Sequence, residues 1–259
     1  MDLRGFARAE LPGFLVAVQF LTRLPLPFEV DYTPEAARSS PRWYPGAGVL
    51  IGLITGAVYW VAALLFPPLI AVLVSVAAGL IVTGGLHEDG FADACDGLGG
   101  VRPRERVLEI MRDSRIGTYG VLGLALMVGT KVAALAALPG AAVPFLLIAG
   151  HAGSRASMLW VMASSDYVRG SGAASAVLGG IDQRAIQIGL GTTALACVPL
   201  LFVLPVLSVL LGLVGLVGGH FAMRQRFERR LGGYTGDCLG AVQQCSEVGF
   251  LLGILMLAG

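Results

Sequence analysis

Seven apolar runs of about membrane-spanning length dominate this sequence. A bilayer offers no water to backbone amides, so runs of this kind fold as α-helices that satisfy their own N–H and C=O groups. The composition agrees, because 56% of the residues are hydrophobic and only 14% are charged. The sequence therefore predicts an all-α polytopic integral membrane helix bundle of about seven spans, which forms one membrane-embedded domain over residues 1–259. The runs lie at about residues 46–66, 69–86, 117–138, 141–163, 185–204, 206–222 and 239–257.

A shorter apolar stretch, residues 14–24, precedes these runs. It follows Arg4 and Arg8 and ends at Arg23, but no small-residue cleavage site follows it, so it does not fit a signal peptide. Because a full span needs about 20 residues, an interfacial or half-spanning helix is predicted. The net charge of +1 does not suggest a nucleic-acid partner.

The connections between the runs alternate in character. The turns at residues 67–68, 139–140 and 205 are short, whereas residues 87–116, 164–184 and 223–238 are long and polar, so all the long connections should lie on one side. Arginines gather in the long connections, which predicts that this side is cytoplasmic and that the C-terminus is outside. Glycines at helix-packing spacing predict close helix contacts at Gly48, Gly52, Gly56, Gly212, Gly215 and Gly218.

The first long connection begins with a concentration of carboxylates. Residues 84–100 read GGLHEDGFADACDGLGG. If this stretch is helical, steps of four and three residues place Asp89, Asp93 and Asp96 on one face, with Glu88 about a quarter turn away. Carboxylates this close repel one another unless a cation lies between them, and Mg²⁺ is held by carboxylates together with substrate phosphates. The stretch therefore predicts a Mg²⁺ site and phosphate chemistry.

Other polar residues near the runs are further candidates. Arg112 and Arg115 could hold phosphate oxygens, and Asp113 could supply another metal ligand. Asp237, Gln244 and Glu247 share one helix face at the start of the last run. Within the runs, Arg155 shares a face with His151 and is a phosphate candidate near the cytoplasmic end, whereas Lys131 is expected to snorkel towards the outer end. His87 is either a structural hydrogen-bonded residue or a general base.

Four motifs together resemble the cobalamin synthases, which are membrane-bound adenosylcobinamide-GDP ribazoletransferases. They are residues 84–100, residues 14–27 (FLVAVQFLTRLPLP), residues 109–121 (EIMRDSRIGTYGV) and residues 233–244 (GYTGDCLGAVQQ). The resemblance covers essentially the whole chain and departs from the usual pattern mildly at Cys95, where a small residue is expected. It implies that a ribose hydroxyl of α-ribazole or its 5′-phosphate attacks the cobinamide-side phosphorus of adenosylcobinamide-GDP, so that GMP leaves and Mg²⁺ is the cofactor.

The resemblance and the residue chemistry together assign roles. Metal and diphosphate binding falls to Glu88, Asp89, Asp93 and Asp96. The first choice for the base is Asp96, with the other carboxylates, Asp93 among them, and His87 as alternatives. The expected substrate contacts are Arg112, Asp113, Arg115, Arg155, Asp237 and Gln244. The expected setting is a bacterial inner membrane with a cytoplasmic active site, contact with membrane lipid, and possible partnership with a second copy or other corrinoid-pathway enzymes.

Two other functions fit parts of the pattern. A CDP-alcohol phosphotransferase also places carboxylates on membrane helices, but its signature has an arginine soon after its Asp-Gly element and a longer gap to its last aspartates, whereas Asp93 and Asp96 follow Gly90 closely. An ion-coupled transporter would place its site near the bilayer midplane, often with a repeat. The acidic motif is instead predicted at a membrane edge, and no repeat is evident.

Overall fold

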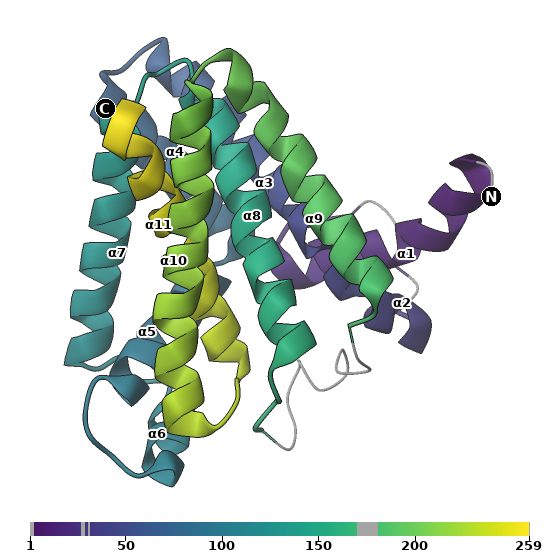
Figure 1. The fold of residues 1–259 in the computed structure, drawn as a ribbon, viewed down its shortest axis with the longest axis vertical. Helices are drawn as coiled ribbons and strands as arrows, with labels where there is room; N and C mark the ends of the chain where they lie inside the picture. The colour runs from purple at the N-terminus through teal and green to yellow at the C-terminus, as the bar shows by residue number, and fades with distance from the viewer. Residues whose placement is uncertain (1–2, 27–28, 31, 170–180, 259) are drawn as a thin grey trace.

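The chain folds into a bundle of α-helices (Figure 1). The structure is a computed structural model that describes residues 3–26, 29–30, 32–169 and 181–258. Over these residues the β-structure is limited to an isolated bridge between Tyr167 and Tyr234, so the predicted all-α fold is confirmed. The helices are α1 (Leu3–Leu21), α2 (Pro34–Ser39), η1 (Ser40–Trp43), α3 (Tyr44–Ala63), α4 (Pro68–Thr83), α5 (Leu86–Leu98), α6 (Arg104–Ile110), α7 (Thr118–Ala137), α8 (Val143–Ser164), α9 (Gln183–Cys197), η3 (Val198–Phe202), α10 (Val206–Leu231) and α11 (Gly236–Ala258).

Five helices of the described residues are long and apolar enough to cross a membrane, or six if the bent pair α4 and α5 is counted as one span. The polytopic prediction is confirmed, but about seven spans is an overestimate on this measure. Two predicted spans, residues 69–86 and 141–163, are not among these five helices, and each has a physical reason. α4 has only 16 residues before an 89° bend, and α8 carries His151, Ser154 and Arg155 in its middle. These side chains are buried against other helices, so α8 lies inside the bundle without being uniformly apolar.

Small residues bring the central helices close together, as predicted for most of the glycines. Gly48 and Gly52 of α3 lie directly against the backbone of α8, at His151 and Ile148. On the other side, Gly215 of α10 contacts the backbone of Gly249 in α11. The prediction for Gly218 is wrong, because it faces open space and its neighbour Gly219 makes the contact with α11 instead. α8 and α11 thus form the centre of the bundle.

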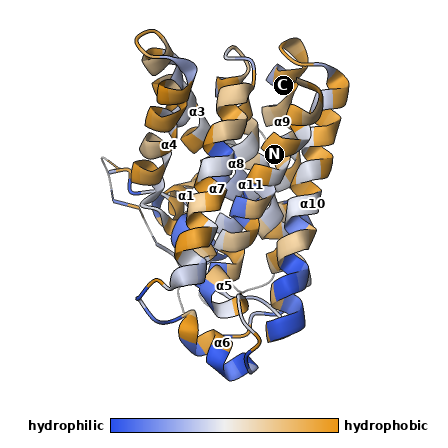
Figure 2. Ribbon diagram, turned by 90° about the vertical axis from the view of Figure 1, so that its left-hand side faces the viewer, coloured by the Kyte–Doolittle hydropathy of each residue, from blue (hydrophilic) through white to orange (hydrophobic). Residues whose placement is uncertain are grey.

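The two ends of the bundle differ in polarity (Figure 2). The short turns lie at the apolar end, whereas α5, α6 and the last turns of α10 lie at the other end, which we call the polar end (Figures 1 and 2). α10 continues beyond the predicted limit at residue 222 to Leu231, so its arginines are helical. The long connections at residues 87–116 and 223–238 lie at the polar end as predicted, whereas most of the connection at 164–184 lies outside the described residues, and the C-terminus lies at the opposite end (Figure 1).

The N-terminal helix α1 runs across the bundle and not along it (Figure 1). Its apolar part, Glu10–Leu21, is shorter than a full span. This agrees with the prediction of an interfacial or half-spanning helix.

Candidate active site

A pair of glycines sets the direction of the helix that carries the acidic motif. Gly84 and Gly85 both have left-handed backbone angles, with φ of 67° and 70°, which glycine adopts without the steric penalty of other residues. The chain can therefore turn by 89° between α4 and α5. α5 then packs on α11, where a Cβ at Gly90 would lie 3.0 Å from the Cα of Asp237. The acidic motif is thus helical from Leu86 to Leu98, and α5 lies at the polar end of the bundle (Figure 1).

Asp89 and Asp93 of α5 face Asp237 at the start of α11, and we call these three residues the acidic cluster. Burial, followed by the neighbouring carboxylates of Asp237 and Asp89, raises the pKa of Asp93 to about 7. Arg169 donates a hydrogen bond from Nη2 to Oδ2 of Asp237 over 2.8 Å. Three carboxylates thus share the polar end with an arginine, and their combined charge is negative.

Asp96 has a different environment from its two predicted partners. Its Oδ2 accepts a hydrogen bond from the N–H of Gly117 over 2.7 Å, and its Oδ1 accepts one from the N–H of Gly120 over 2.9 Å. Asp96 therefore caps the N-terminus of α7 from a separate helix and is stabilised by the positive end of the α7 dipole. Both oxygens of the Asp96 carboxylate already accept backbone hydrogen bonds. Its role as base or metal ligand stays a prediction.

The predicted phosphate contacts near residue 113 lie on the surface. Asp113 and Arg115 form an ion pair with a shortest distance of 2.6 Å. Hydrogen bonds from the side chain and backbone of Arg115 lower the pKa of Asp113 to about 2. Together with Asp96 they line a cavity of about 300 Å³, and Arg112 is exposed beside them. The Arg115 guanidinium is thus engaged with Asp113 in this structure.

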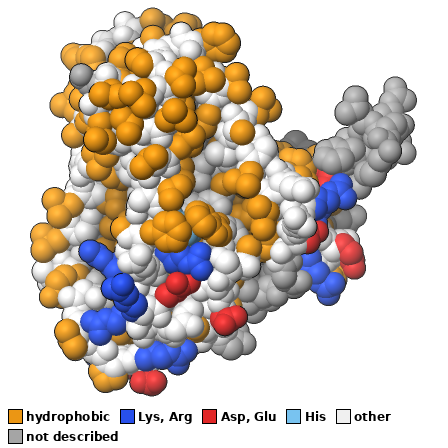
Figure 3. Space-filling model, viewed as in Figure 1, with side chains coloured by type: hydrophobic (Ala, Val, Ile, Leu, Met, Phe, Trp, Pro, Cys, Tyr) orange, Lys and Arg blue, Asp and Glu red, His pale blue; other side chains and the backbone are white. Residues whose placement is uncertain are grey.

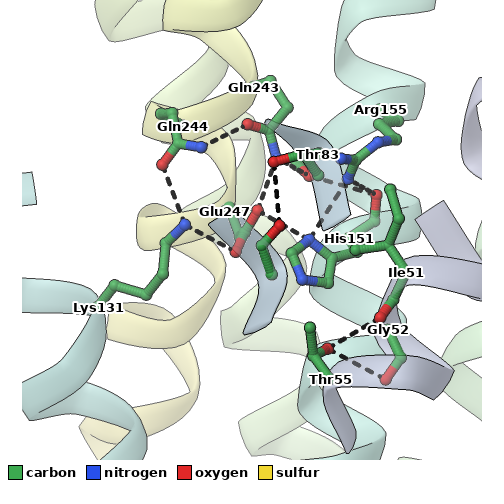
Figure 4. Close-up of polar contacts among 12 residues, drawn as sticks. Ile51, Gly52, Thr55, Thr83, Lys131, His151, Arg155, Gln243, Gln244 and Glu247 are labelled. Carbon is green, nitrogen blue, oxygen red and sulfur yellow. Dashed lines mark hydrogen bonds and ion pairs between the residues drawn. The ribbon is translucent and has the colours of Figure 1, made fainter. Parts of the chain in front are cut away.

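A second set of polar groups lies inside the bundle (Figure 4). Lys131 pairs with Glu247 over 3.0 Å and donates a hydrogen bond to Oε1 of Gln244 over 3.0 Å. His151 Nδ1 lies 3.3 Å from Oε2 of Glu247. We call the set the interior polar network; it comprises Lys131, His151, Arg155, Gln243, Gln244 and Glu247. The expectation that Lys131 snorkels is wrong, because the residue is only 5% exposed and has buried partners.

His87 and Glu88 face this network and not the acidic cluster. Gln244 donates a hydrogen bond from Nε2 to Oε1 of Glu88 over 2.8 Å, which links α5 to α11. Glu88 Oε2 and His87 Nε2 are buried and have no hydrogen-bond partner among the described residues. Both residues line a small cavity of about 20 Å³ together with Arg155. The structure therefore brings Glu88, His87, Arg155 and Gln244 together, at a separate place from Asp89 and Asp93.

Arg169 was not among the predicted site residues. A local backbone pairing holds its segment in place: the Tyr234 N–H donates to the Asp166 carbonyl over 2.8 Å, and the Val168 N–H donates to the Tyr234 carbonyl over 3.0 Å. The pairing joins the connection after α8 to the turn before α11. A single arginine in a long polar connection carries no spacing signal, so the sequence could not identify it.

The acidic cluster is chemically suited to a hard cation. Its donors are carboxylate oxygens, which Mg²⁺ prefers, and the pKa of Asp93 is raised by burial first and by the neighbouring carboxylates second. Within the described ranges, however, no three His, Cys, Asp or Glu side chains are arranged as ligands of one ion. The fit rests on the chemistry of the donors, and the Mg²⁺ site stays a prediction.

These features define an all-α polytopic membrane protein with a carboxylate-rich site at the polar end of its bundle. A family model described as cobalamin-5-phosphate synthase matches residues 13–255, so the chain belongs to that family. A protein of Leptothrix cholodnii named adenosylcobinamide-GDP ribazoletransferase is 41% identical over 251 residues, covering 93% of this chain and 94% of the relative. A Shewanella frigidimarina protein of the same name is 40% identical, with 95% of each chain covered. No solved structure matches the chain significantly.

Proposed function

We propose that this chain is an adenosylcobinamide-GDP ribazoletransferase, which joins α-ribazole or its 5′-phosphate to adenosylcobinamide-GDP and releases GMP. The relatives that match this chain over nearly their whole length are named for this activity. The structural observation that carries the proposal is the acidic cluster, which faces Arg169 at the polar end of the bundle. Carboxylates and a guanidinium at a membrane edge suit a diphosphate substrate that arrives from water.

The proposed reaction needs a proton acceptor and charge compensation. The ribose hydroxyl oxygen forms a bond to the cobinamide-side phosphorus, the bond from that phosphorus to the bridging oxygen breaks, and the bridging oxygen leaves with GMP. Asp93 is the preferred acceptor of the hydroxyl proton, because it is half-buried beside the carboxylates of Asp89 and Asp237. Arg169 would orient Asp237 and contact a phosphate oxygen.

Asp89 and Asp237 are the residues proposed to hold Mg²⁺, with Asp93 beside them as the proton acceptor. When bound, the cation would neutralise charge on the diphosphate and the leaving GMP. Glu88 would support α5 through its hydrogen bond to Gln244.

The proposed location is the bacterial inner membrane, with the polar end in the cytoplasm. The arginines of residues 102–115 and 224–230 support this orientation, because basic loops remain on the cytoplasmic side. Association with a second copy or with other enzymes that handle corrinoids stays a prediction.

The test uses purified protein in lipid nanodiscs. We expect GMP and a cobalamin product on incubation with adenosylcobinamide-GDP, α-ribazole and Mg²⁺, and no product after chelation with EDTA. Asp89→Asn, Asp93→Asn and Asp237→Asn should each lower kcat on the order of 100-fold. Glu109→Gln, an exposed carboxylate on α6 at the same end, is the matched control and should keep full activity. Absence of product from wild-type protein would overturn the activity, and full activity of the three variants would overturn the site.

A further inference from the structure

A groove on the outer surface of the bundle has no place in the proposed reaction. It lies between α5, α7 and α10 and has a volume of about 690 Å³. Its walls combine apolar side chains with guanidinium groups, and we call it the basic groove. Leu98, Leu122 and Leu126 line its apolar side, and Arg226, Arg229 and Arg230 line its basic side.

The basic groove is separate from the acidic cluster. Ala94, Cys95 and Leu98 of α5 line the groove, and at about 100° per residue they lie on the opposite face of the helix from Asp89 and Asp93. No aspartate or glutamate is among the described residues that line the groove. A ligand there would meet positive charge and hydrocarbon, whereas the acidic cluster presents negative charge.

The arginines of the groove are available to an anion. Arg226 and Arg229 are exposed and form no hydrogen bond or ion pair with the described residues. Arg230 donates to the carbonyl of Gly100 over 2.8 Å. By contrast, Arg224 on the same helix pairs with Glu228 over 2.8 Å. The guanidinium groups that face the groove are therefore less neutralised than their neighbour, which suits a phosphate group.

The apolar wall continues from the arginines along the bundle. On α7, exposed residues recur at helical spacing at Tyr119, Leu122, Leu126, Gly129 and Ala133, and Leu126 is 71% exposed. Hydrophobic side chains cover the bundle above a group of Lys and Arg side chains near the polar end (Figure 3). This order of charge and hydrocarbon matches the order of headgroup and acyl chain in a phospholipid.

The facing side of α10 leaves space for a chain. Val214, Gly218 and Ala222 are exposed at steps of four residues on the face that leads to Arg226. A Cβ at Gly218 would meet nothing within 4 Å. The space beside Gly218 can therefore accept an acyl chain.

We propose that the basic groove binds one anionic phospholipid, with its phosphate on Arg226 and Arg229 and an acyl chain between α7 and α10. The preference for an anionic headgroup follows from the uncompensated guanidinium groups, and juxtamembrane basic residues attract such lipids. The proposal goes beyond the proposed enzymatic activity and does not depend on it.

The test measures lipid retention by native mass spectrometry on delipidated protein titrated with phosphatidylglycerol or phosphatidylcholine. Wild type should retain one phosphatidylglycerol roughly tenfold more tightly than phosphatidylcholine. The double variant R226Q/R229Q should lose that preference. R38Q/R106Q, which removes the same charge from exposed arginines outside the groove, should keep it. Equal binding of both lipids to wild type, or the same loss in both double variants, would overturn the proposal.

Two further arms address folding and the source of the phosphate. Gly218→Leu fills the space for the acyl chain and leaves every arginine in place, so it should weaken phosphatidylglycerol retention while the helical circular dichroism stays unchanged. Inorganic phosphate and GMP at millimolar concentration should not displace the lipid. Full retention by Gly218→Leu, or displacement by either soluble phosphate, would contradict a lipid site; displacement would identify a site for soluble phosphates.

Discussion

The buried pair between Lys131 and Glu247 allows a quantitative test of the interior polar network. Replacing Lys131 by Met keeps most of the side-chain volume but removes the charge 3.0 Å from Glu247. Glu247 is 3% exposed, so its carboxylate would remain buried without its lysine. Removal of one partner from a buried pair costs about 3–5 kcal/mol. Glu247 keeps a hydrogen bond from Gln243 over 2.6 Å and its contact with His151, so we expect the lower value, about 3 kcal/mol.

The assay is equilibrium unfolding in mixed detergent and SDS micelles, followed by far-ultraviolet circular dichroism. The double variant K131M/E247M should recover most of the lost free energy of unfolding, because both charges are then absent. Leu126→Met, on the exposed face of the same helix, is the control and should change the free energy by less than about 0.5 kcal/mol.

Two outcomes would contradict the dependence of Glu247 on the Lys131 charge. If Lys131→Met unfolds within about 0.5 kcal/mol of wild type, Glu247 does not depend on the lysine charge. If the double variant is as unstable as the single one, the loss comes from packing at residue 131.

Three further predictions concern the polar end and its helices. Asp96→Ala should lower the free energy of unfolding by about 1–2 kcal/mol and speed hydrogen exchange of the amides in the first turn of α7; unchanged exchange there would contradict the capping role. Gly85→Ala should lower the free energy of unfolding by about 1 kcal/mol, because residue 85 has a positive φ. Gly218→Ala lies inside a helix with open space beside it and should raise the free energy of unfolding by roughly 0.5–1 kcal/mol. Equal changes for the two variants in chemical denaturation would refute the role of the backbone angle. Arg169→Gln should lower kcat/KM roughly 10–100-fold in the GMP-release assay, with Arg169→Lys intermediate and Arg106→Gln as control; wild-type kinetics would remove Arg169 from the site.

The sequence predicted those features that depend on local patterns. The concentration of carboxylates after an apolar run is visible in the sequence, and the shared polar end follows from the alternation of short and long connections. The environment of Asp96 could not be predicted, because its partners are the backbone amides of a helix that begins after a further connection.

The interior contacts were beyond a pattern-based prediction for a similar reason. Lys131 near one end of an apolar run is consistent with snorkelling until the distant Glu247 is known to lie beside it. Likewise Glu88 and Asp89 are adjacent in sequence, yet one faces Gln244 in the interior and the other is exposed at the polar end. Which face of α5 meets α11 is decided by the close approach at Gly90, and that is a tertiary contact.

The glycine pair at residues 84 and 85 also decides which residues can meet across the bundle. α4 runs from the apolar end towards the polar end, so the acidic residues after it lie on the polar side whether or not the chain bends. The 89° bend changes their direction, and it lays α5 against α11, where Glu88 contacts Gln244 and Gly90 packs on Asp237. Two left-handed glycines thus join the connection after α4 to the last helix of the chain.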